Sequence, residues 1–153
     1  MEQSTNNSRI INAAPEAVYK AFTNPSALEA WQAPGDMKAK VYDFDFRVGG
    51  GYSMSLFYSE SDSEARGKTQ GNEDHFTAKF VEIIPAKKIV QMIKFYSSDP
   101  AFLEEMKMVV TFDIEKKGTK VTFLFENIPT SISPEDNERG TKSSLEKLAL
   151  FVE

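Results

Sequence analysis

The chain has 153 residues, of which 41% are hydrophobic, and a formal net charge of −5 at pH 7; this is the size of one domain with its own core. It contains no cysteine and a single histidine, His75, which excludes disulfides, thiolate metal sites, cysteine nucleophiles and any site that needs two histidines. The acidic balance, without a basic stripe, argues against nucleic-acid binding.

The sequence shows no targeting signal and no cofactor-binding motif. The first residues lack the charged-then-apolar layout of a signal peptide, and no apolar run approaches the roughly 18 residues of a membrane-spanning helix. The lack of cysteine fits a reducing compartment, so we expect a single cytoplasmic domain over residues 1–153. The glycine cluster 49–51 joins two strand-like segments and does not open a helix, so it is not a phosphate-binding loop. We expect no metal and no cofactor.

A short strand and two short helices are the first predicted elements. Ile10 and Ile11 carry a strand over residues 8–12. Pro15 suits the first position of a helix over 15–23, and Asn24 followed by Pro25 suits the cap and first turn of a second helix. Two helices this short are too small to form a core, so they must support a larger element.

Between residues 40 and 127 the apolar residues recur with a period of two, which is typical of strands with one buried face. The pattern predicts six strands and a long exposed polar loop over 59–74. The strands run over residues 40–48, 52–58, 76–84, 89–96, 104–115 and 120–127. Alternation fails in 76–84, so the facing of that strand and of 89–96 stays open, and a β-bulge is one explanation. Short turns between consecutive strands imply an antiparallel sheet.

In the first of these strands, charged and apolar residues alternate. The side chains expected to face the core are Tyr42, Phe44, Phe46 and Val48. Asp43, Asp45 and Arg47 fall on the solvent face. Asp45 and Arg47 are two residues apart, so we expect an exposed salt bridge worth at most about 1 kcal/mol, and not a carboxylate pair for acid–base catalysis.

A long amphipathic helix closes the chain over residues 133–153. Ser133 can cap it, Pro134 suits its first position, and Asp136 has the capping-box spacing. One helical stripe is formed by Thr141, Leu145, Leu148, Ala149 and Val152. Gly140 interrupts it at a cost of roughly 1 kcal/mol, so the helix either bends there or approaches a neighbour closely. With helices segregated from an antiparallel sheet, the predicted class is α+β.

Several spaced fragments match one family in its own order, from about residue 9 to the C-terminus. They are Pro15, Thr23-Asn24-Pro25 with Leu28 and Trp31, then Asp45, Arg47, Gly49, Gly50 and Tyr52, then Glu82, Ile83 and Pro85, then Gly118-Thr119, and finally Gly140, Leu145 and Leu148. On these residues the chain resembles the bacterial proteins related to the C-terminal domain of the activator of heat-shock protein 90 ATPase. They belong to the START-like, or SRPBCC, superfamily that includes the birch pollen allergen. Thr141 departs from the family, which usually has Trp there; Gln32 and Ala78 replace an aromatic residue and a glycine.

The resemblance implies a helix-grip fold: a seven-stranded antiparallel sheet wrapped around the long C-terminal helix, with two short helices after the first strand. It also implies an apolar cavity between sheet and helix, which in relatives holds lipids, sterols, polyketides or other hydrophobic molecules. Some relatives are cyclases or hydratases, and some bind chaperones. Without the family's Trp at position 141, we expect a larger or repacked cavity.

The residues expected to line this cavity are Trp31, Phe44, Phe46, Tyr52, Met54, Phe123, Thr141, Leu145 and Leu148. Ordinary core packing is the alternative for each of them. Trp31 is either a lid at the cavity mouth or a staple between the short helices. The hydroxyl groups of Tyr52 and Tyr58 could orient a polar ligand group. A lone histidine is not a triad, so we do not assign His75 a catalytic role.

Three functional hypotheses follow. The first is a non-catalytic binding protein for a small hydrophobic molecule, such as a lipid. The second is a cyclase- or hydratase-like enzyme in the same cavity, which needs buried polar groups of perturbed pKa. The third is a chaperone-associated domain that uses an outer surface. We expect a small hydrophobic molecule and possibly a chaperone as partners, no nucleic acid and no membrane span, in a monomer or weak homodimer.

Overall fold

The computed structural model describes residues 3–33, 38–57, 73–95, 105–116, 118–129 and 132–153. Its elements in chain order are β1 (Thr5–Ile11), α1 (Pro15–Lys20), α2 (Pro25–Trp31), β2 (Lys38–Asp45), β3 (Gly51–Phe57), β4 (Glu73–Ile84), β5 (Lys88–Phe95), β6 (Met106–Glu115), β7 (Gly118–Glu126) and α3 (Pro134–Val152). The predicted order of strand, two short helices, six strands and long helix is confirmed, and so is the α+β class.

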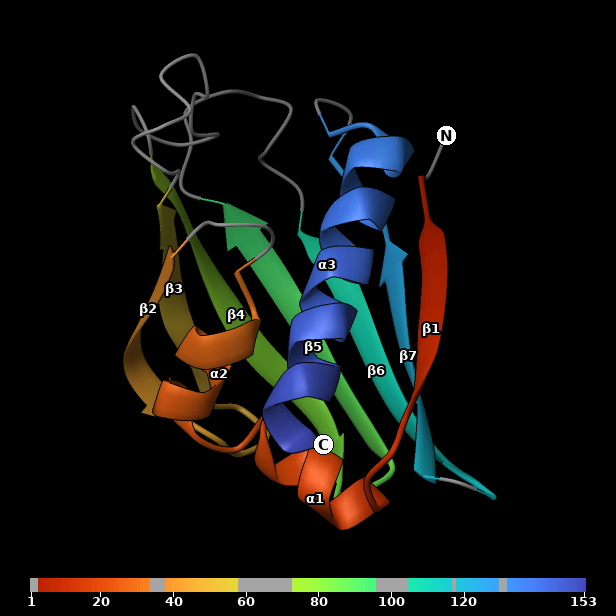
Figure 1. Ribbon diagram of the computed structural model, residues 1–153. Helices are drawn as coiled ribbons and strands as arrows, with labels where there is room; N and C mark the ends of the chain where they lie inside the picture. The colour runs from red at the N-terminus through yellow and green to blue at the C-terminus, as the bar shows by residue number, and fades with distance from the viewer. Residues whose placement is uncertain (1–2, 34–37, 58–72, 96–104, 117, 130–131) are drawn as a thin grey trace.

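All strands within the described ranges belong to one antiparallel seven-stranded sheet, in the order β1-β7-β6-β5-β4-β3-β2. Strands β2 to β7 are each paired with their neighbours in the chain, and β1 adds to the edge beside β7, with Thr5 opposite Phe125 and Ile11 opposite Thr119. Helix α3 lies along one face of the sheet, and α1 and α2 lie on the same side (Figure 1). This is the helix-grip arrangement.

Local sequence explains why α3 begins and faces as it does. The Ser133 hydroxyl accepts a hydrogen bond from the Asp136 backbone N–H at 3.1 Å, and Pro134 occupies the first turn. The buried residues of the helix are Thr141, Ser144, Leu145, Leu148 and Ala149. The predicted stripe is therefore confirmed, with Ser144 added and Val152 only partly buried at its end. The 19 residues span about 28 Å.

Trp31 fastens the two short helices together. Its indole Nε1 donates to the Ala21 carbonyl at 2.9 Å, and its ring centroid lies 4.7 Å from that of Phe22. Only 1% of the residue is exposed, which fits the predicted staple and not a lid at a cavity mouth. The predicted cap of α2 is also confirmed, because the Asn24 side chain accepts from the backbone N–H groups of Ser26 and Ala27.

Which side chains of β4 and β5 point toward the helices depends on one shift in the pairing of these strands. The register of β4 against β5 shifts between Phe80 and Glu82, where Val81 has no partner in the pairing; a bulge there explains why the alternation fails. On the helix-facing side before the bulge lie Phe76, Ala78 and Phe80, all buried. Strand β4 also begins earlier than predicted, at Glu73, because it pairs with β3 as far as Phe57. The rest of the predicted polar loop, residues 59–72, lies outside the described residues, and so does Tyr58 at the end of the predicted strand.

Two boundary predictions near β1 and α1 need correction. Strand β1 starts at Thr5 and not at Ser8, because its pairing with β7 extends to that residue. Helix α1 ends at Lys20 and not at Thr23, although Ala21 and Phe22, which follow it, are still buried.

The predictions that Tyr42 and Val48 face the core are wrong. Val41, opposite Met54, packs against the core, whereas the Tyr42 ring lies beside His75. Strand β2 ends at Asp45, and its register against β3 shifts between Tyr42 and Asp45. Val48 then falls in the following turn, where it is 60% exposed. The expected surface salt bridge is confirmed, with Arg47 Nε 2.7 Å from Asp45 Oδ2 and both side chains largely exposed.

Candidate functional site

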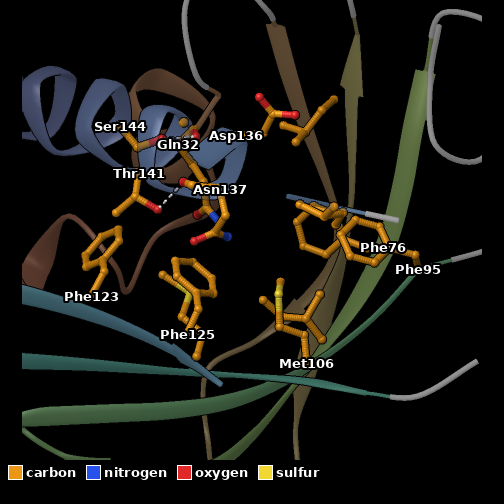
Figure 2. Close-up of a pocket in the computed structure, with 15 residues that line it drawn as sticks. Gln32, Phe76, Phe95, Met106, Phe123, Phe125, Asp136, Asn137, Thr141 and Ser144 are labelled. Carbon is orange, nitrogen blue, oxygen red and sulfur yellow. Dashed lines mark hydrogen bonds between the residues drawn. The ribbon is translucent and has the colours of Figure 1, made fainter. Parts of the chain in front are cut away.

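A cavity of about 200 Å³ lies between the sheet and the first half of α3. Its apolar lining comes mainly from the strands and consists of Leu56, Phe76, Ile93, Phe95, Met106, Met108, Phe123, Phe125 and Ile132. Its other lining residues are Gln32, which caps the end of α2, and Asp136, Asn137, Gly140, Thr141 and Ser144 of α3. Figure 2 shows the two sets facing each other across the cavity. The cavity therefore has one apolar wall and one polar wall.

The polar wall is held in place by hydrogen bonds to backbone carbonyls. The Thr141 hydroxyl donates to the carbonyl of Asn137 at 2.8 Å, and the Ser144 hydroxyl donates to the carbonyl of Gln32 at 2.8 Å. The Asn137 side-chain oxygen accepts from the hydroxyl of Thr5 on β1. The bond between Ser144 and Gln32 holds α3 against α2, and the bond between Thr5 and Asn137 holds it against the edge strand β1. The hydroxyl hydrogens of Thr141 and Ser144 are both donated to backbone carbonyls.

The apolar wall is rich in rings and sulfur. The rings of Phe76 and Phe95 meet edge to face, with centroids 5.8 Å apart, and Met106 and Met108 lie on the neighbouring strand β6. Unbranched thioether side chains adapt readily to the shape of a neighbour and make favourable contacts with aromatic rings. This wall can therefore adjust to a flat apolar molecule.

The structure brings only some of the predicted site residues to this cavity. Phe123 and Thr141 line it. Trp31 and Tyr52 line a separate void of about 10 Å³, which shares Gln32 and Met108 with the larger cavity. The remaining predicted residues are not among the described lining residues of either space: Met54, Leu145 and Leu148 are fully buried in the core, and Phe44 and Phe46 stack on each other and pack beside Phe80. Their role as ligand contacts stays a prediction.

Sequence reasoning missed most of the wall that lies on β4, β5 and β6. The missed residues on these strands include Phe76, Phe95 and Met106, and Phe125 of β7 and Asn137 of α3 were missed as well. The alternation of Phe76, Ala78 and Phe80 was an available signal, but the bulge that follows obscured the facing of the strand. Asn137 lies one turn before Thr141 on the same face of α3, so helical periodicity could have found it.

Tyr52 is a buried residue that places a hydroxyl group close to the cavity. It accepts a hydrogen bond from the Gln91 amide at 3.3 Å. Burial raises the pKa of this hydroxyl above its ordinary value, and hydrogen bonds with Gln91 and Gln32 partly oppose that effect. Near neutral pH Tyr52 is therefore an uncharged donor and acceptor and not a base.

His75 is placed away from the cavity. Its Nδ1 lies 2.7 Å from the Ser55 hydroxyl. The next residue in β4, Phe76, lines the cavity, and neighbouring residues of a strand point to opposite faces. Among the described residues, no group of three or more histidine, aspartate or glutamate side chains is placed to hold a metal ion.

Within the described ranges, no helix is both long enough and apolar enough to cross a membrane. A comparison of the sequence with curated proteins gave no match.

Solved structures with the same fold span almost the whole chain. Protein CV1439 from Chromobacterium violaceum is 30% identical, with 97% of this chain and 96% of that chain covered and a TM-score of 0.85. The AHSA1-like protein from Aeromonas hydrophila is 20% identical, with 98% and 92% covered and a TM-score of 0.72. Protein NE0264 from Nitrosomonas europaea is 18% identical, with 97% and 93% covered and a TM-score of 0.75. The last two share the fold at low identity.

The sequence profile of the family described as "Activator of Hsp90 ATPase homolog 1-like protein" matches residues 12–153. That match covers both short helices, six of the strands and the whole of α3. The chain therefore belongs to the activator of Hsp90 ATPase homolog 1-like family.

Proposed function

We propose that this protein binds a small hydrophobic molecule in the cavity between α3 and the sheet. The observation that carries the proposal is a space of about 200 Å³ with a largely apolar lining. Protein interiors are normally packed so closely that voids larger than a water molecule are few. An apolar cavity of about 150 Å³ is already large enough to take up benzene. A space of this size and lining therefore suits a ligand.

The position of Thr141 supports the same function. Thr141 lines the cavity and is 5% exposed. The resemblance described above has a Trp at this position, and an indole ring there would fill much of the space. The smaller side chain leaves room for a ligand between the polar and apolar walls.

Methionine methyl groups provide a direct test. Met106 and Met108 line the cavity, whereas Met92 is next to the lining residue Ile93 in β5, points to the opposite face of the sheet and serves as an internal control. Methylnaphthalene, added to protein with labelled methionine methyl groups, should shift the NMR signals of Met106 and Met108 saturably and leave that of Met92 in place. Native mass spectrometry of freshly purified protein would reveal a molecule already bound. Methyl signals that do not respond to the probe would contradict the proposal.

A cyclase- or hydratase-like activity in the same cavity is the second candidate. The observation that favours it is the buried Tyr52 hydroxyl, whose raised pKa and contact with Gln32 place a protonated group beside the cavity. Loss of turnover in Tyr52→Phe, with the fold retained, would support an enzyme; it would not be expected for a binding protein.

A chaperone-associated role is the third candidate, and the description of the family favours it. Such a role would use an outer surface, so a chaperone should then co-purify with protein whose cavity is empty. We place the protein in the cytoplasm as part of the proposal, on the absence of cysteine from its sequence.

A further inference from the structure

We propose that the cavity selects a small aromatic molecule whose polar group donates a hydrogen bond and carries no negative charge, such as an aryl alcohol or an aryl amine. The inference rests on the proposed binding function and adds to it the chemistry of the ligand.

The two hydroxyl groups of the polar wall act as acceptors toward a ligand. The hydroxyl hydrogens of Thr141 and Ser144 are both donated to backbone carbonyls. A hydroxyl oxygen that donates its hydrogen can still accept, so Thr141 and Ser144 offer acceptors to a ligand. Asp136 is also a lining residue, but its side chain is 66% exposed and pairs with Arg139, so its carboxylate belongs to the edge of the wall. A ligand group that brings its own hydrogen satisfies this wall.

The lining offers no positive charge to a buried anion. None of the described lining residues is Lys, Arg or His. Arg139 is paired with Asp136 at 3.3 Å, but its side chain is 79% exposed and it is not a lining residue. Moving a carboxylate out of water without a partner of opposite charge is strongly unfavourable.

The wall also contains two amides that can donate to the ligand, those of Gln32 and Asn137. The oxygen of the Asn137 amide accepts from Thr5, and its NH₂ group is a donor. A ligand hydroxyl can accept from this group while it donates to Thr141 or Ser144. A hydroxyl is therefore the group that satisfies the wall in both directions.

Size and ring contacts limit the apolar part. A volume of about 200 Å³ lies between the roughly 150 Å³ that accommodates benzene and the roughly 300–1,000 Å³ of drug-sized pockets. The wall contains four phenylalanines, Phe76, Phe95, Phe123 and Phe125, and two methionines. Edge-to-face and sulfur contacts favour a flat ring, and one or two fused rings fit the space.

Four probes with one ring system and different polar groups test this selection by calorimetry near neutral pH. They are methylnaphthalene, naphthalenemethanol, aminonaphthalene, whose amine on the ring is uncharged at this pH, and naphthoate. We expect the alcohol and the amine to bind at least about tenfold more tightly than the carboxylate. Thr141→Val and Ser144→Ala should each lower the preference for the alcohol over methylnaphthalene several-fold. Thr122→Val makes the same isosteric change on the other face of β7 and should leave this preference unchanged.

Failure of the selection and failure of the binding function give different results. Naphthoate that binds as tightly as the alcohol, while methylnaphthalene also binds, overturns the ligand class and leaves the binding function in place. A preference for the alcohol that is unchanged in both wall variants overturns the acceptor role of the wall. If none of the four probes binds, the binding function fails and the selection fails with it.

Discussion

The hydroxyl of Ser144, in the middle of α3, donates a hydrogen bond of 2.8 Å to the backbone carbonyl of Gln32, which caps the end of α2. These residues are 112 positions apart in the sequence. Both line the cavity, together with Thr141 and Asn137. The contact therefore joins the closing helix to the short helices and positions part of the cavity wall.

Loss of this contact should lower stability by a modest amount. Ser144→Ala leaves the Gln32 carbonyl without its side-chain partner, and the net contribution of such a bond is about 0.5–1.5 kcal/mol. Urea unfolding should show a loss in that range. Ser8→Ala, an exposed position on β1, is the matched control and should stay within about 0.5 kcal/mol of the parent. Equal effects of the two substitutions would argue against a structural role for the contact.

Restoring a large ring at position 141 should close the cavity. Thr141→Trp places an indole in the space that Thr141 now borders, so binding of methylnaphthalene should be lost while the circular dichroism spectrum is retained. Lys142→Trp adds the same ring at an exposed neighbouring position of α3 and should leave binding unchanged. A Thr141→Trp protein that still binds the probe would place the ligand elsewhere.

A comparison of two leucines tests whether the cavity is open, because one lies in packed core and the other borders the cavity. Leu148 is fully buried and is not among the described cavity-lining residues, whereas Leu56 borders the cavity and is only partly buried. Leu148→Ala should cost about 2–5 kcal/mol, because a new void forms in packed surroundings. Leu56→Ala should cost nearer 1 kcal/mol, because its side chain already borders open space. Chemical unfolding of both variants measures the difference, and a Leu56 cost equal to that of Leu148 would count against an open cavity.

Stability should fall in strongly alkaline solution, in part through Tyr52. Burial raises the pKa of its hydroxyl above the ordinary value of 10.0, so the folded protein holds this proton more tightly than the unfolded chain. The stabilisation is complete below the unfolded pKa and is lost as the pH rises from there through the folded pKa. In Tyr52→Phe this part of the loss should disappear from unfolding measurements at increasing pH. Burial also raises the pKa of Tyr19, so Tyr19→Phe is needed to separate the two contributions. A Tyr52→Phe protein with the same alkaline loss as the parent would show that Tyr52 does not contribute.

The sequence alone determined the features that depend on near neighbours. Ser133 and Asn24 cap helices because their side chains reach backbone N–H groups two or three residues later. The stripe that includes Thr141 and Leu148 follows from the helical period. The ordered motifs identified the family and with it the helix-grip fold. All of these signals are local, or are read directly along the chain.

Only the tertiary structure decided where the cavity lies. Thr141 and Leu148 belong to one buried stripe, yet Thr141 borders the cavity and Leu148 lies in packed core. Periodicity shows which face of α3 is covered, but the filling of the space opposite depends on side chains from distant strands. Phe76 and Phe95 reach that space through the register of β4 and β5, which shifts at Phe80 and Glu82. The side chains opposite the first half of α3 do not fill the space between helix and sheet. Their total volume cannot be read from any one segment of the sequence.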